Sequence, residues 1–242
     1  MRTDIEAIRL TTKAIFDSLK IEPVKGFEKL GICIHPFINN SISFDNKNAR
    51  MLNLTKPDDF SYWRSMVFDI IDKQNISGLF CMLSTAWKMT WFKYICNNLD
   101  KKDYAKYLKM CWTEQDNPNQ DVNVSLKEAI EFFQAADKDL LMDKEELEHY
   151  NSLSDKVTIY RGVSPGREQF GLSWTDDKEK AIWFKERFEH NNAEGYLLTA
   201  TIPKKYILAY LDVRNEKELV VDMNRWKKSR PLWSALSITS DN

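Results

Sequence analysis

The chain has 242 residues, 43% of them hydrophobic and 29% charged, with a formal net charge of −1. This composition is typical of a globular protein, and the chain is long enough to form a core without disulfide or metal cross-links. The near-zero charge gives no global attraction to nucleic acid or to an anionic membrane. The four cysteines share no ligand spacing with the three histidines, so we expect no metal site.

Residues 1–150 are expected to form a mainly helical N-terminal region that packs on the rest of the chain. Apolar residues at helical spacing predict a helix from Ile5 to Leu19. Residues 20–57 lack periodicity and are expected to be irregular or to form short strands. Polar residues that can cap helices precede the later segments: Asp58 or Asp59 for a helix to Asp72, Ser77 for one to Asn97, Asp100 for one to Thr113, Ser125 with Glu128, and Asp143 with Glu146.

The most apolar stretch, residues 76–96, contains Lys88 and Lys93. Because each lysine is costly at a bilayer centre, this stretch favours a buried helix over a membrane span. The N-terminus also lacks the apolar run of a signal peptide, so we expect a cytoplasmic protein with no membrane partner.

The character of the sequence changes after Tyr150. β-Branched and aromatic residues predict strands at 157–160, 172–175, 195–202, 206–211 and 219–221, with a helix capped by Asp176 after the second strand. This helix is expected to carry Ala181, Ile182, Phe184 and Phe188 on one face. We interpret the basic run 225–230 as a strand end or turn, with a phosphate-binding patch as the alternative. Helices followed by a small, mostly antiparallel sheet indicate an α+β fold, with a second domain over 151–242.

Three short motifs follow one another in this second region. They are Tyr160-Arg161-Gly162 at a strand end, Gly171-Leu172-Ser173-Trp174-Thr175 before the capped helix, and Arg214-Asn215-Glu216-Lys217-Glu218 before the last strand. This order of arginine, serine and Glu-x-Glu resembles the Arg-Ser-Glu class of ADP-ribosyltransferases, including bacterial and phage-borne members. The resemblance covers residues 157–222 and implies a split β-sheet that binds NAD⁺ as substrate.

The resemblance also implies a role for each motif residue. Arg161 would offer a planar fork of donors to phosphate, and Gly162 would hydrogen-bond the nicotinamide amide. Ser173 would orient the ribose and the catalytic carboxylate. Glu218 would stabilise the ribosyl cation, and Glu216 would position or deprotonate the acceptor.

The remaining residues assigned to the NAD⁺ site are Thr175 and two aromatic side chains. Trp174 or Phe184 would shield the nicotinamide ring, and the alternative for both is a place in the core. Arg161 and Ser173 are only 12 positions apart, so little room remains for a helix between their strands. The serine motif of the family usually reads Ser-Thr-Ser, whereas this chain has Ser-Trp-Thr.

Three functions stay open at this point. The first is transfer of ADP-ribose to a macromolecule, with the first glutamate favouring an arginine on a protein. The second is modification of RNA or DNA by a toxin or phage-defence protein, and the third is an inactive binding module that keeps the fold. A toxin of this class would also allow for an inhibitor or antitoxin partner.

Overall fold

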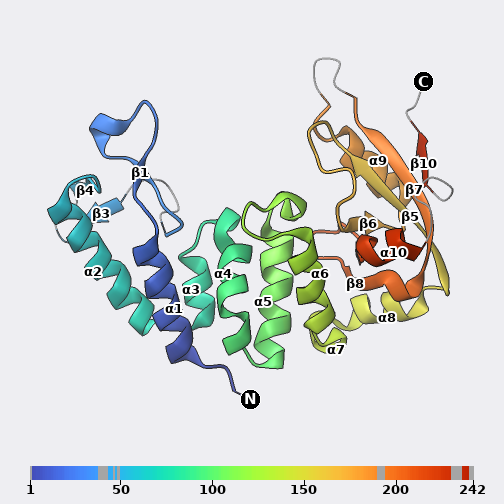
Figure 1. Ribbon diagram of the computed structural model, residues 1–242, viewed down its shortest axis with the longest axis horizontal. Coiled ribbons are helices and arrows are strands. Elements are labelled where there is room, and N and C mark those ends of the chain that lie inside the picture. Colours follow the sequence, from blue (N-terminus) through green and yellow to red (C-terminus); the bar gives the residue numbers. More distant parts are fainter. Residues whose placement is uncertain are drawn as a thin grey trace. The chain divides into compact units, whose positions relative to one another are not determined.

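The computed structural model describes residues 2–37, 43–45, 47, 50–189, 194–229 and 236–239. The chain divides into two compact units, residues 1–100 and residues 101–242. Helices and antiparallel sheets are both present, which confirms the α+β class (Figure 1). Within the described ranges, no helix has the length and hydrophobicity that a membrane crossing requires.

The first unit consists of helices and two small antiparallel sheets. Its α-helices are α1 (Ile5–Ser18), α2 (Pro57–Lys73), α3 (Ile76–Cys81) and α4 (Lys88–Ile95), with 3-10 turns at Glu28–Leu30, Thr85–Trp87 and Cys96–Asn98. Its short strands are β1 (Glu22–Pro23), β2 (Cys33–Ile34), β3 (Ser43–Asp45) and β4 (Arg50–Leu52). Phe16 and Trp63, whose ring centroids lie 5.0 Å apart, belong to the buried core of this unit.

Two predictions for this unit were wrong in detail. Helix α2 begins at Pro57, because proline suits the first helical position, and the predicted cap Asp59 instead accepts the backbone N–H of Asn53. The single helix predicted over 77–97 is divided into α3 and α4. Asn75, rather than Ser77, caps α3, and the Ser84 N–H donates to the distant carbonyl of Pro36 instead of continuing a helix.

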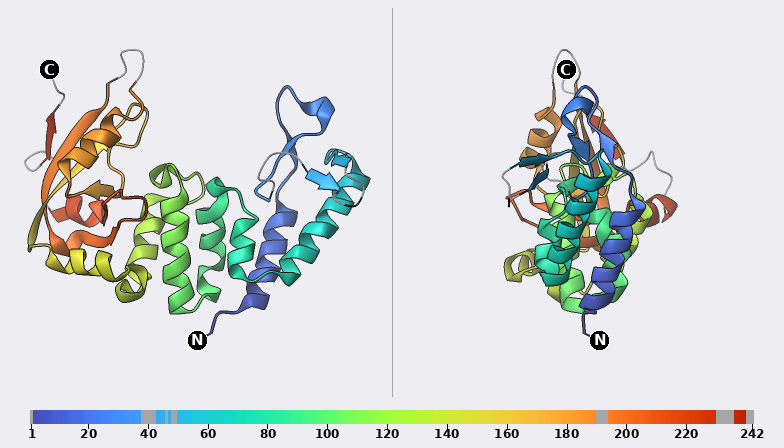
Figure 2. Two further views of the ribbon diagram at one scale, coloured as in Figure 1. Left: turned by 180° about the vertical axis from the view of Figure 1, so that it is seen from behind. Right: turned by 90° about the vertical axis from the view of Figure 1, so that its left-hand side faces the viewer.

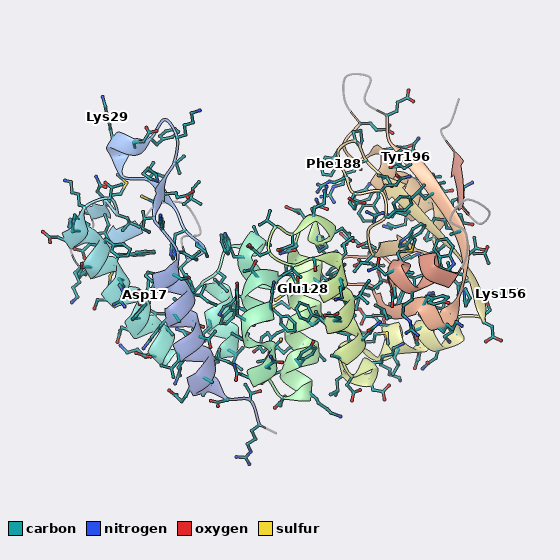
Figure 3. All side chains as sticks on the ribbon, in the orientation of Figure 1. Asp17, Lys29, Glu128, Lys156, Phe188 and Tyr196 are labelled. Atoms are coloured by element: carbon teal, nitrogen blue, oxygen red, sulfur yellow. The ribbon has the colours of Figure 1, made fainter. Side chains whose placement is uncertain are left out.

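The second unit begins with four helices: α5 (Lys101–Glu114), α6 (Leu126–Ala135), α7 (Lys138–Leu141) and α8 (Lys144–Ser152), with a 3-10 turn at Pro118–Gln120. Both predicted capping boxes are confirmed, at Ser125 with Glu128 and at Asp143 with Glu146. Figure 3 labels Glu128 on α6. These helices are tied to the sheet by side chains, since Gln134 donates to Asp222 and Tyr150 donates to the carbonyl of Ile207.

A six-stranded antiparallel sheet completes this unit (Figures 1 and 2). Its strands lie in the order β10-β7-β5-β6-β9-β8. Its strands are β5 (Lys156–Val163), β6 (Ser173–Thr175), β7 (Tyr196–Pro203), β8 (Ile207–Leu211), β9 (Glu218–Val221) and β10 (Leu236–Thr239). Helix α9 (Lys178–Glu186), a 3-10 turn at Lys204–Tyr206 and helix α10 (Met223–Ser229) connect them. The predicted strands are confirmed within a few residues, and β10 was missed.

The boundary between the two compact units falls after Asp100, whereas the sequence analysis divided the chain at residue 150. The bonds of Gln134 and Tyr150 described above tie α6 and α8 to the sheet, and all four helices α5–α8 belong to the same unit as the sheet. The composition of the chain changes at residue 150. The boundary between units, however, is set by which helices and strands pack against each other.

Three local predictions in the second unit were also wrong. Asp177 caps α9 by accepting from the Lys180 N–H, while Asp176 instead pairs with His149 at 2.7 Å. Helix α9 ends at Glu186, so Phe188 lies beyond it. The basic run expected as a strand end or turn is helical over 225–229, because the Asp222 side chain accepts the Arg225 N–H, and Arg230 lies outside the described residues.

Candidate functional site

The sheet opens between β5 and β6. These strands pair at one position, Tyr160 with Thr175, whereas β5 pairs with β7 over its whole length from Lys156 to Val163. Strand β6 continues its pairing with β9 instead, through Ser173 and Val220. The two central strands therefore diverge beyond Tyr160, and a cavity lined by Arg161, Ser173, Glu216 and Glu218 lies at the opening.

The guanidinium of Arg161 bridges this opening. It donates to three backbone carbonyls, those of Ser173 at 2.6 Å, Glu168 at 2.7 Å and Gln169 at 3.2 Å. Burial lowers the pKa of Arg161 to about 10, which leaves it charged at neutral pH, and the nearby Glu218 carboxylate opposes that shift. The donors that the sequence analysis assigned to phosphate are thus engaged in holding the 164–172 segment to β5. No helix separates Arg161 from Ser173 in this described segment, as their short spacing indicates.

Glu218 is the first residue of β9 and stands opposite Thr175 of β6. Its Oε1 accepts the indole N–H of Trp112 at 2.9 Å. Burial raises the pKa of the Glu218 carboxyl above its ordinary value, while hydrogen bonds from Ser173 and Trp112 partly offset that rise. The carboxylate is therefore held in a poorly solvated place by two specific donors.

Ser173 is anchored by Asn119, a residue of the polar segment between α5 and α6. The Asn119 Nδ2 donates to the Ser173 Oγ at 2.8 Å, and the Asn119 Oδ1 accepts from the Leu172 N–H at 2.5 Å. The side chain of Asn119 also lies where a side chain on Gly171 would stand, because a Cβ there would meet the Asn119 Oδ1 at 2.6 Å. Gly171 therefore permits this close approach.

Glu216 lies in the turn before β9, two residues ahead of the first residue of that strand. The turn is strained, since Arg214, Asn215 and Lys217 have φ of 129°, 54° and 50°. The Lys217 ammonium donates to Asp177 at 2.7 Å and so ties the turn to the start of α9. The carboxylate of Glu216, a quarter exposed, pairs with the Arg214 guanidinium at 3.3 Å.

Aromatic and cationic side chains form another part of the cavity wall. Phe184 of α9 and Phe188, which Figure 3 labels, both line it, as do Arg167 and Arg187. The two guanidinium carbons lie 5.0 and 5.1 Å from the ring centroid of Phe188. Among the described residues, neither arginine has a carboxylate within ion-pair distance, so both charges are available to an anion.

The remaining predicted residues have structural contacts of their own. Trp174 is 2% exposed and donates to the carbonyl of Gly171 at 3.0 Å, so of the two aromatic candidates Phe184 presents more surface. The Thr175 Oγ1 accepts the Asp177 N–H at 3.1 Å. Gly162 allows α9 to approach β5, since a Cβ there would lie 1.9 Å from the carbonyl oxygen of Ala181.

The sequence analysis missed four residues of this site: Trp112, Asn119, Arg167 and Arg187. Trp112 has the pattern of a core residue in an amphipathic helix, and it is 1% exposed. Asn119 and Arg167 lie in segments to which the sequence analysis assigned no helix or strand. No local signal marks these residues, because their partners are far away in the sequence.

Within the described residues, no group of three or more histidine, cysteine, aspartate or glutamate side chains could hold a metal ion. Comparison of the chain with protein-family models, with curated proteins and with solved structures finds no match.

Proposed function

We propose that this chain is a mono-ADP-ribosyltransferase that cleaves NAD⁺ and transfers ADP-ribose to a macromolecular acceptor. The observation that carries the proposal is that Arg161, Ser173 and Glu218 line one cavity, although they are far apart in the sequence. The opening between β5 and β6 supports a split sheet of the ADP-ribosyltransferase type.

The proposed reaction breaks the bond between the ribose C1′ and the nicotinamide nitrogen. Nicotinamide leaves as a neutral molecule with the bonding electrons, and positive charge develops on the ribose. A carboxylate fixed beside that charge stabilises the transition state, and it does so more strongly in a poorly solvated site than in water. Glu218 meets this requirement because it is partly buried and oriented by two donors.

The cavity wall also suits the rest of the dinucleotide. Arg167 and Arg187 would hold the pyrophosphate, because guanidinium groups bind phosphate oxygens in pairs of hydrogen bonds. Phe184 and Phe188 offer ring surfaces on which planar bases can stack. In this assignment Arg161 shapes the site by holding the 164–172 segment, and the phosphate contact passes to the two arginines that have no carboxylate partner.

The acceptor that the geometry favours is an arginine side chain of a protein. Glu216 already binds a guanidinium, that of Arg214, at the cavity. An acceptor arginine that displaced Arg214 would meet the same carboxylate, which could orient its nitrogen and take its proton. Transfer to RNA or DNA stays the second candidate. We also propose that the protein acts as a toxin or phage-borne effector and that an inhibitor or antitoxin binds it.

An inactive binding module would have no use for the charge on Glu218. Burial raises the pKa of this carboxyl, so keeping it ionised at neutral pH opposes folding. A module that only bound a partner could replace it with glutamine at no loss. A carboxylate in this poorly solvated place therefore supports catalysis.

Incubation with NAD⁺ labelled in the adenylate phosphate, in a cell lysate, tests the proposal. We expect label on macromolecules that protease digestion removes and nuclease digestion does not, and Glu218→Gln serves as the inactive control. Loss of label to nuclease would select the polynucleotide acceptor. Neither labelling nor release of nicotinamide by the parent protein would reject the enzyme and leave the binding module.

A further inference from the structure

Two residues outside the three motifs, in the segment from α5 to the 3-10 turn at Pro118–Gln120, orient the proposed catalytic carboxylate directly or through Ser173. Trp112 lies in the last turn of α5, and its side chain is 1% exposed. Its indole N–H donates to the Glu218 Oε1 at 2.9 Å. The indole ring is fixed by edge contact with Phe133 of α6, with centroids 5.2 Å apart and planes at 89°. An indole N–H can only donate, so the accepting oxygen must carry a lone pair.

A second chain of bonds reaches Glu218 through Ser173, and its polarity follows from the backbone. The Leu172 N–H can only donate, so the Asn119 atom that it contacts must be the carbonyl oxygen. The amide nitrogen of Asn119 then faces Ser173 and donates to its Oγ. Because that hydroxyl oxygen accepts from Asn119, its own hydrogen is free to donate to Glu218, the side-chain partner that it has in this structure.

We propose that Trp112 and Asn119 are positioning residues that hold Glu218 as an oriented carboxylate, one through a direct bond and the other through Ser173. Both residues belong to a segment that is separate from the sheet in sequence, but only Trp112 contacts the carboxylate directly. The inference rests on the proposed function for its catalytic consequence, but the geometry of the carboxylate does not depend on which reaction takes place.

The arrangement opposes the effect of burial on the ionisation of Glu218. Burial raises the pKa of Glu218, and the nearby Glu216 charge raises it further. The bonds from Ser173 and Trp112 and the positive charge of Arg161 lower it. Without the indole donor, the pKa of Glu218 rises further and a smaller fraction of the carboxyl is ionised at any given pH. Activity that needs the carboxylate is then lost at a higher pH as the solution is acidified.

Trp112→Phe in the full chain tests the direct bond, because phenylalanine keeps an aromatic ring but has no N–H. We expect the acid limb of the pH profile for NAD⁺ cleavage to move to higher pH. Near neutral pH we expect kcat to fall about 10- to 100-fold, the usual effect of losing a hydrogen bond to a charged group, with a smaller change in KM. A merely structural role would lower the amount of folded enzyme without moving the pH profile.

Trp91→Phe provides a matched control. Trp91 is 2% exposed, its indole N–H donates to the Thr12 Oγ1 at 3.0 Å, and it has an edge contact with Phe80 at 4.4 Å. The control therefore loses a buried indole bond in the first unit, and its pH profile should match that of the parent. If Trp112→Phe fails to fold, replacement of Trp112 by benzothienylalanine keeps the ring shape and substitutes sulfur for the N–H.

Titration of the Glu218 carboxyl by NMR separates this inference from the proposed function. We expect the Glu218 pKa to be higher in both Trp112 variants than in the parent or in Trp91→Phe. An unchanged Glu218 titration would overturn the positioning role even if the enzyme is active. If the parent cleaves no NAD⁺ but the titration moves as expected, the proposed function fails and the positioning role stands.

Discussion

Glu218→Gln is the substitution that tests the proposed mechanism most directly, because glutamine keeps the shape of the side chain and removes its charge. The amide oxygen of glutamine can still accept the Trp112 N–H, so the orientation of the side chain should persist. What disappears is the negative charge beside the developing ribosyl cation. Loss of one such preorganised group costs about 2.7–4 kcal/mol in comparable electrostatic sites, or roughly 10²–10³ in turnover.

The same substitution should not destabilise the folded protein, although it lowers turnover. The pKa of Glu218 is raised by burial, so its ionised form makes folding less favourable at neutral pH, and glutamine removes that penalty. The loss of attraction to Arg161 acts against this gain, although Glu168 still contributes to the field at Arg161. We therefore expect a thermal midpoint no lower than that of the parent, together with the large loss of turnover.

The assay combines nicotinamide release, NAD⁺ binding by calorimetry and thermal unfolding. Affinity for NAD⁺ should change little, because the lost interaction acts mainly in the transition state. Near-parental turnover would show that catalysis does not need the charge of Glu218 and would refute the mechanism. A loss of turnover accompanied by a collapse of the thermal midpoint would assign the residue a structural role instead.

Three further predictions follow from the site and the fold. Glu216→Gln should abolish transfer to the acceptor while slow NAD⁺ hydrolysis persists, because water needs less positioning than a side-chain nucleophile. Protein labelling measures the first activity and nicotinamide release the second, and a parallel loss of both would contradict the assigned role. Arg167→Ala combined with Arg187→Ala should raise KM for NAD⁺ at least tenfold with little change in kcat, and steady-state kinetics with an unchanged KM would remove both from the phosphate site. The fragment 101–242 should unfold cooperatively on heating, as followed by circular dichroism, whereas 151–242 lacks α5–α8 and should not; a stable 151–242 would mean that those helices are dispensable.

Local signals predicted much of the fold because they act between residues a few positions apart. The capping box at Ser125 needs only Glu128, three residues away, and its geometry is independent of the rest of the chain. The β-branched run of β5 similarly indicates a strand whichever neighbours it acquires. Predictions failed where a distant partner took over the local bonds, as at Ser84, whose N–H donates to Pro36 and interrupts the predicted helix.

The sequence by itself determined the order and chemistry of the three motifs, and with them which side chains could meet. It could not determine how they meet. Trp112 and Glu218 are 106 positions apart, and only the packing of α5 beside the sheet brings the indole to the carboxylate. Likewise, the sequence shows that Arg161 carries a positive charge and several hydrogen-bond donors. Only the structure shows that β5 and β6 diverge at this residue, so that its donors bind backbone carbonyls. Hydrogen bonds between distant side chains require both partners to be positioned by the whole fold, and for that reason tertiary structure alone fixes the site.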